Sequence, residues 1–320
     1  MPFAYVRPTT WDDAFALLRE GGSQALGGGT DLIPLIREHR TSPSRVVDLR
    51  GIPGARAITD HDDGSVTIGA AVTLGQLASS AVVVSRFPAL VAASRASGSY
   101  ALRTTGTIGG NLGQHVRCWY FRHGHPCLRL GNDRCSAQLG ENQYHAVFQQ
   151  GPCVAVHPSD PAVALYALDA EVDVRGETGT RRMSVAALLA TSRERLDGTT
   201  TLAPGEVVTA IHLPAGSAGG VQHYDKAMQR GAWDFALVSL AATRRRDGEV
   251  RIVLGGVANT PWRITDSIEE DVAVGGLADD DIETLAQRAL YDARPLAGNA
   301  YKLETAGALL RRGIIALLAG

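Results

Sequence analysis

The chain has 320 residues, of which 45% are hydrophobic, which is enough for two or three packed units. Its formal net charge of −2 disfavours a nucleic-acid-binding protein, and no apolar run approaches the ~20 residues of a membrane span. The N-terminus has no charged segment followed by an apolar core, as a signal peptide would have. We therefore expect a cytoplasmic protein, or a periplasmic one if a partner subunit carries the export signal.

The first unit, residues 1–55, is expected to be strand, glycine loop, helix and strand. Thr10 can cap a helix that runs through Leu18, because its hydroxyl can accept from the first turn. A short strand ends at Leu26, and residues 32–38 are expected to form a helix. A second strand is expected at residues 45–49.

The glycine loop of this unit, residues 27–31, reads Gly-Gly-Gly-Thr-Asp. Free N–H groups before a helix favour an anion such as a diphosphate, and glycines allow its close approach to the backbone. The loop is not GxGxxG, so a Rossmann fold is not indicated. A tight strand–helix turn without a ligand accounts for the loop equally well.

The second unit is expected at residues 56–217, with an irregular insert at about 115–155. Thr73 can cap a helix, and a further helix is expected to start at Ser159 or Asp160. The pattern also predicts strands at 65–68, 171–174 and 181–185 and a helix at 87–97, and the helix that starts at Ser159 or Asp160 is expected to cover residues 161–168.

The third unit is expected at residues 218–320. The pattern predicts strands at 221–228 and 251–257, a hairpin at Asp247-Gly248, and helices at 236–242, 280–291 and 300–318. Strands in more than one unit, with helices on one side, indicate an α+β architecture.

Three further positions outside the first loop could contact a ligand. Thr107–Asn111 is a second glycine loop whose backbone and polar side chains can bond a phosphate or a ribityl chain. Asp160 is typical of a helix N-cap, although its carboxylate could also hold a cofactor. Lys226 lies in an expected strand, where a lysine usually faces solvent but could stabilise a reduced, negatively charged cofactor.

All four cysteines of the chain, Cys118, Cys127, Cys135 and Cys153, fall in the insert with the spacing C-x8-C-x7-C-x17-C. The absence of CxxC excludes zinc ribbons and most ferredoxin-like patterns. Thiolates suit an iron–sulfur cluster or zinc, and inert or disulfide-forming cysteines are the third possibility. Nearby arginines could offset the charge of a thiolate-ligated cluster, or form a solvated basic loop.

Five segments in this order carry a resemblance to a known family: ALGGGTDLIPLI, TIGGNLGQ, HPSDPAVALYALDAEV, KAMQRGAWDFALVSLAA and GGVANTPWR. The chain resembles, from end to end, the FAD-binding medium subunit of the molybdenum hydroxylases, the xanthine dehydrogenase family. The cysteine-bearing insert resembles the variant with an extra 4Fe-4S cluster, nearest the FAD subunit of the aldehyde oxidoreductases.

The resemblance implies a two-subdomain flavin-binding domain of the vanillyl-alcohol-oxidase type, followed by an α+β C-terminal domain. It implies metal ligation by the four cysteines and no catalytic acid or base. The implied FAD-binding residues are Leu26, Gly27, Gly28, Gly29, Thr30, Asp31, Leu32, Ile33, Ser97, Thr107, Ile108, Gly109, Gly110, Asn111, Asp160, Val208 and Lys226.

The function implied by the resemblance is electron transfer within an oxidoreductase complex. A molybdopterin-binding large subunit would oxidise the substrate, and a small subunit with 2Fe-2S clusters would pass the electrons to FAD on this chain. FAD would then reduce an external acceptor. The alternatives are the β subunit of a 4-hydroxybenzoyl-CoA-reductase-like enzyme, a stand-alone flavin oxidase, and a zinc-stabilised scaffold protein.

Overall fold

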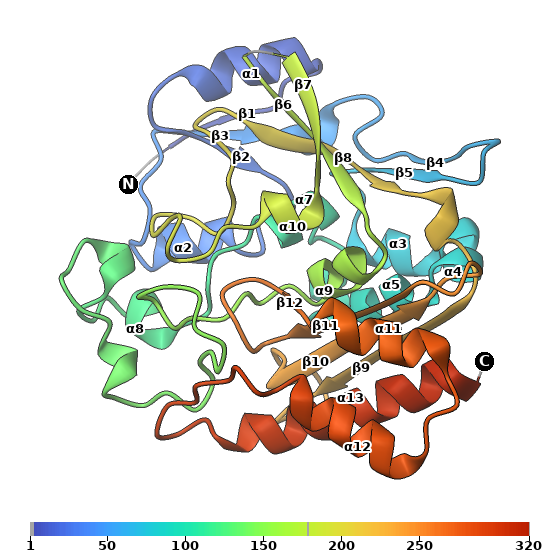
Figure 1. Cartoon of the computed structure of the whole chain (residues 1–320). Helices are drawn as coiled ribbons and strands as arrows, with labels where there is room; N and C mark the ends of the chain where they lie inside the picture. Colours follow the sequence, from blue (N-terminus) through green and yellow to red (C-terminus); the bar gives the residue numbers. More distant parts are fainter. Residues whose placement is uncertain (1–2, 178, 320) are drawn as a thin grey trace.

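The computed structural model describes residues 3–177 and 179–319, and it contains three β-sheets with helices packed against them (Figure 1). The α+β architecture expected from the sequence is confirmed. No helix in the described part of the chain is both long and apolar enough to cross a membrane.

The N-terminal sheet is parallel, in the order β1-β3-β2. Thr10 accepts from the backbone N–H of Asp13 and caps α1, as predicted. Helix α1 packs its buried face, with Ala14 and Leu18, onto this sheet. The elements are β1 (Ala4–Val6), α1 (Trp11–Arg19), β2 (Ser23–Leu26), α2 (Leu32–Arg37), β3 (Arg45–Asp48) and the 3-10 turn η1 (Leu49–Gly51).

The second sheet is antiparallel and five-stranded, in the order β4-β5-β8-β6-β7. Its central strand, β8, was not predicted. Its strands are β4 (Ile58–Asp60), β5 (Val66–Gly69), β6 (Glu171–Gly176), β7 (Gly179–Ser184) and β8 (Val207–Leu213). The helices of this region are α3 (Leu74–Ser79), α4 (Ala81–Arg86), α5 (Pro88–Ala96), α6 (Tyr100–Arg103), α7 (Ile108–Leu112), α9 (Asp160–Ala167) and α10 (Val185–Leu188).

The C-terminal sheet is antiparallel, in the order β12-β11-β10-β9, and lies between two layers of helices. Helices α5 and α9 contact one side of it, and α13 contacts the other (Figure 1). After the turn η4 (Ala215–Ser217), its elements are β9 (Val221–Ala227), β10 (Val238–Arg244), β11 (Val250–Gly255), β12 (Trp262–Arg263), α11 (Asp266–Val274), α12 (Asp279–Arg288) and α13 (Tyr301–Ala319).

The predicted helix at 236–242 is wrong, because this segment is strand β10. Strand β10 pairs with both β9 and β11 and is buried on both faces, so it lacks the alternation that identifies a half-buried strand. Its run of small and apolar residues therefore could not be distinguished from a buried helix.

The cysteine-bearing insert lies at one side of the molecule and is largely irregular (Figure 1). Its regular structure is limited to α8 (Trp119–Arg122) and the 3-10 turns η2 (Leu128–Leu130) and η3 (Ser136–Gln138). The division into units at residues 55 and 217 stays a prediction.

Candidate functional site

The two glycine loops pack directly against each other. A Cβ atom on Gly27 would lie 2.3 Å from the Thr107 hydroxyl, and one on Gly28 would lie 2.0 Å from the Thr105 carbonyl oxygen. Gly29 has a φ of +74°, which a side chain would strain. Glycine is therefore required in the first loop by contact with the second loop, before any ligand is considered.

The paired loops line a groove of about 580 Å³. Seven predicted site residues do not line it: Leu26, Ile33, Ser97, Ile108, Asn111, Asp160 and Lys226. The predicted residues that do line it are Gly27, Gly28, Gly29, Thr30, Asp31, Leu32, Thr107, Gly109, Gly110 and Val208.

The second loop is a short helix, α7, rather than the loop that we expected. Thr107 caps it by accepting from the N–H of Gly110. Ile108 is fully buried in the core, so its side chain cannot contact a ligand in the groove. Asn111 accepts a hydrogen bond from the Ser159 hydroxyl, which connects α7 to the start of α9.

Asp31 connects the first glycine loop to the cysteine-bearing insert. Its carboxylate accepts from the backbone N–H of His115 at 2.7 Å and pairs with Arg122 at 2.6 Å and Arg117 at 2.8 Å. The carboxylate is thus occupied by groups of the insert. Its side chain positions the loop at the border of the groove.

Asp160 and Lys226 form a buried ion pair at 2.8 Å. The Asp160 carboxylate also accepts from Tyr224 at 2.8 Å and from Ser97 at 3.2 Å. Burial raises the pKa of Asp160, although Lys226 beside it opposes this shift. The N-cap of α9 is Ser159 and not Asp160, so the N-cap interpretation of Asp160 is wrong.

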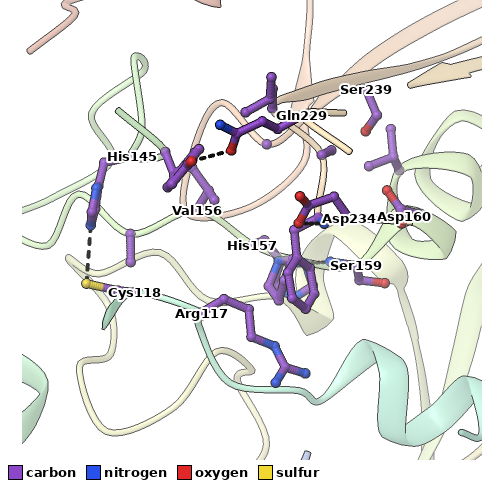
Figure 2. Close-up of a pocket in the computed structure, with 18 of the residues that line it drawn as sticks. Arg117, Cys118, His145, Val156, His157, Ser159, Asp160, Gln229, Asp234 and Ser239 are labelled. Carbon is purple, nitrogen blue, oxygen red and sulfur yellow. Dashed lines mark hydrogen bonds between the residues drawn. The ribbon is translucent and has the colours of Figure 1, made fainter. Parts of the chain in front are cut away.

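A second pocket, of about 320 Å³, lies beside this ion pair. Figure 2 shows Asp160 near one end of the pocket and Cys118 with His145 near the other. His157 lines the middle, and its buried Nε2 has no hydrogen-bond partner in the part of the chain that the structure describes. Burial lowers the pKa of His157 to about 4, so the ring is neutral.

The four thiols gather in one part of the insert, and all four are free. Cys127 and Cys153 are buried, and Cys118 packs against them. Burial raises the pKa of Cys118 to about 11, whereas a hydrogen bond from Cys135 and the nearby Arg129 lower the pKa of Cys153 to about 5. Within residues 3–177 and 179–319, no three His, Cys, Asp or Glu side chains are arranged to hold a metal ion.

Two nitrogen atoms contact the sulfur atoms, and neither contact was identified from the sequence. Nε2 of His145 lies 3.2 Å from Sγ of Cys118, and Nε of Arg129 donates to Sγ of Cys153 at 3.2 Å. A charged donor such as Arg129 stabilises negative charge on sulfur.

Residues 195–200 form one wall of the groove and were not predicted from the sequence. This segment has no glycine-rich or cysteine pattern, so no motif could have identified it. Tyr224, which bonds Asp160, was missed as well. The spacing in the sequence could have identified Tyr224, because Tyr224 and Lys226 are two residues apart in β9 and therefore share a face.

Comparison with known proteins identifies the family. Residues 1–216 match the family described as FAD binding domain in molybdopterin dehydrogenase. The chain is 36% identical to the aldehyde oxidoreductase FAD-binding subunit PaoB of Escherichia coli (strain K12), over 94% of this chain and 93% of that protein. It is 28% identical to the carbon monoxide dehydrogenase medium chain of Hydrogenophaga pseudoflava, over 98% of this chain and 96% of that one.

Solved structures share the fold. A chain of carbon monoxide dehydrogenase from Hydrogenophaga pseudoflava aligns with a TM-score of 0.77 at 24% identity, covering 100% of this chain and 98% of that one. A chain of quinoline 2-oxidoreductase from Pseudomonas putida 86 aligns with a TM-score of 0.76 at 20% identity, with the same coverage. From its family match and its relatives, this chain belongs to the FAD-binding domain family of the molybdopterin dehydrogenases and is an oxidoreductase subunit.

Proposed function

We propose that this chain is the FAD-binding electron-transfer subunit of a molybdenum hydroxylase complex and that it also carries a 4Fe-4S cluster. The observation that carries the proposal is the groove between the two glycine loops, within the segment that matches the FAD-binding family. We assign no side chain of this chain as a catalytic acid or base.

The groove fits a dinucleotide because seven glycines, which carry no side chain, are among the residues that line it. Gly27 to Thr30 and Gly109-Gly110 border it from two sides, so an extended diphosphate could meet N–H groups of both loops. We place the flavin end toward Asp160 and Lys226, with Ser97 held against the same carboxylate. Bound FAD supplies a group that takes up and releases electrons.

The cluster is proposed from the chemistry and gathering of the four thiols. Sulfur ligands suit iron–sulfur centres, and the set Cys118, Cys127, Cys135 and Cys153 includes the buried thiol of Cys153, which accepts an N–H from Arg129. A cluster spreads its ligands around several iron atoms, so it does not require the close grouping of a single-ion site. Such a cluster would supply a one-electron carrier beside the flavin.

The partners and substrate are proposed from the relatives. One relative is named as the FAD-binding subunit of an aldehyde oxidoreductase, which favours an aldehyde as the substrate of the complex. A molybdopterin-binding large subunit would oxidise it, and a small 2Fe-2S subunit would deliver the electrons here. The pocket beside Asp160 is the proposed exit toward an external acceptor.

The test is cofactor analysis of the complex purified anaerobically with its partner subunits. We expect flavin absorption bands together with a broad band that bleaches on reduction, and iron beyond that of the 2Fe-2S subunit. Cys135→Ser should lose the additional iron and keep FAD, because Cys135 lies outside the groove.

Other outcomes would contradict parts of the proposal. Flavin without the additional iron would exclude the cluster, and a colourless subunit would favour a scaffold protein. Substrate oxidation by this chain alone would favour a stand-alone flavin oxidase. Unchanged iron in Cys135→Ser would remove Cys135 from the ligand set.

A further inference from the structure

We propose that Arg129 is a positioning residue shared by both redox centres, holding Cys153 on one side and a wall of the flavin groove on the other. This inference rests on the proposed function, since it requires a cluster on the four cysteines.

The guanidinium of Arg129 makes three hydrogen bonds in two directions. Its Nε donates to Sγ of Cys153 at 3.2 Å. Its Nη1 donates to the carbonyl oxygens of Leu196 at 3.1 Å and Gly198 at 2.7 Å. Because the guanidinium is planar and rigid, these bonds fix the sulfur relative to residues 196–198.

The carbonyl groups of Leu196 and Gly198 belong to the groove wall at residues 195–200. Gly198 and Arg129 both line the groove, beside Asp197 and Thr199. Asp197 is paired with Arg195, and within the described residues no carboxylate pairs with Arg129. The positive charge of Arg129 is therefore available to the sulfur and to an anionic group in the groove.

This geometry has a defined effect on the cluster. An N–H donor and a positive charge at a ligand sulfur stabilise the more negative, reduced state, so their loss lowers the reduction potential. The same loss leaves the carbonyls of Leu196 and Gly198 without their donor, which loosens the groove wall and weakens FAD binding. One residue should thus change two separate measurements.

The experiment compares three variants of the holo-complex. Arg129→Leu removes the charge and the donors, and Arg129→Lys keeps the charge but cannot bond the sulfur and both carbonyls together. Arg134→Leu is the matched control, because Arg134 is an exposed arginine of the same insert. The measurements are the midpoint potential of the cluster, from anaerobic redox titration followed by electron paramagnetic resonance, and the FAD dissociation constant.

We expect Arg129→Leu to lower the midpoint potential and to raise the FAD dissociation constant roughly tenfold. Arg129→Lys should show a smaller shift in potential, and Arg134→Leu should change FAD binding by less than about twofold. If Arg129→Leu does not fold, Arg129→Lys carries the test.

Wild-type values for both measurements in Arg129→Lys and in any folded Arg129→Leu would overturn the inference. The same would follow if Arg134→Leu shifted both measurements as far as the Arg129 variants do. A wild-type complex without the cluster would instead contradict the proposed function, so the two failures are distinguishable.

Discussion

Gly28 is in contact with backbone and not with a movable side chain. A Cβ there would lie 2.0 Å from the Thr105 carbonyl oxygen and 2.7 Å from the Gly106 Cα. We expect Gly28→Ala to push the two loops apart, lowering the free energy of unfolding by about 1–3 kcal/mol and reducing FAD occupancy. Urea unfolding and the flavin content of the purified complex measure the two effects.

The matched control is Gly21→Ala. Gly21 is exposed, and a Cβ there would meet nothing within 4 Å. This variant should unfold and bind FAD as the wild type does. Full FAD occupancy in Gly28→Ala would show that contact between the loops does not form the binding groove.

Because His157 is buried and neutral, we expect the free energy of unfolding to depend on pH. Its folded-state pKa is lowered to about 4 by burial, whereas an unfolded histidine titrates near the ordinary value of 6.5. Below pH 6.5 the unfolded chain therefore binds a proton that the folded chain excludes. The stability that the neutral ring contributes is fully present above pH 6.5 and is lost as the pH falls toward 4, by about 1.4 kcal/mol per pH unit.

Replacing this ring tests the assignment. Between pH 7 and pH 5, the free energy of unfolding should fall by about 2 kcal/mol less in His157→Gln than in the wild type. Urea unfolding at both pH values measures this difference. His123→Gln, which changes an exposed histidine, should keep the wild-type pH dependence. An identical pH dependence in all three proteins would show that His157 does not titrate as described.

At the scale of elements, the C-terminal region fixes the segment that carries His145. Asn299, just before α13, is fully buried and donates to the carbonyls of His145 and Ala146 at 3.0 Å each. Its side-chain oxygen Oδ1 accepts from the backbone N–H of Leu296. The segment beside Cys118 is therefore held by a residue more than 150 positions away in sequence.

Asn299→Ala should leave these backbone groups without partners. We expect the free energy of unfolding to fall by about 2 kcal/mol, and hydrogen exchange to become faster at residues 142–147. Gln287→Ala, an exposed change on α12, is the control and should leave both unchanged. Wild-type exchange rates at residues 142–147 in Asn299→Ala would contradict this role.

Elements with local signals were predicted well from the sequence. The Thr10 and Thr73 caps place α1 and α3 correctly, because capping depends on residues within one turn. The helix predicted in place of strand β10 was wrong, and strand β8 was not predicted. Pairing with neighbouring strands, rather than the local sequence pattern, determines both strands. The second glycine loop was recognised as a site, but not as the helix α7.

The whole molecule shows why the site was predicted only in part. Both glycine loops carry their signal in their own residues, and the structure brings them together at Gly27 and Thr107. The Asp31 ion pairs with Arg117 and Arg122 join segments that are distant in sequence. No motif records such pairs, because they depend on how the insert folds back onto the first loop.

The packing of the core joins the regions that bear the site. The largest core cluster includes Ala241 and Val253 from the C-terminal sheet together with residues of α5, α9 and the five-stranded sheet. Asp160 on α9 and Lys226 on β9 therefore meet across one continuous core. Rigid placement of both residues follows from this shared packing.

A cryo-electron microscopy map of the complex with its partner subunits tests most directly whether FAD occupies the groove between the two glycine loops. We expect density for the FAD diphosphate between the loop at Gly27–Thr30 and helix α7, with the flavin end toward Asp160. A map with FAD bound elsewhere on this chain, or with the groove empty in a flavin-loaded complex, would contradict it.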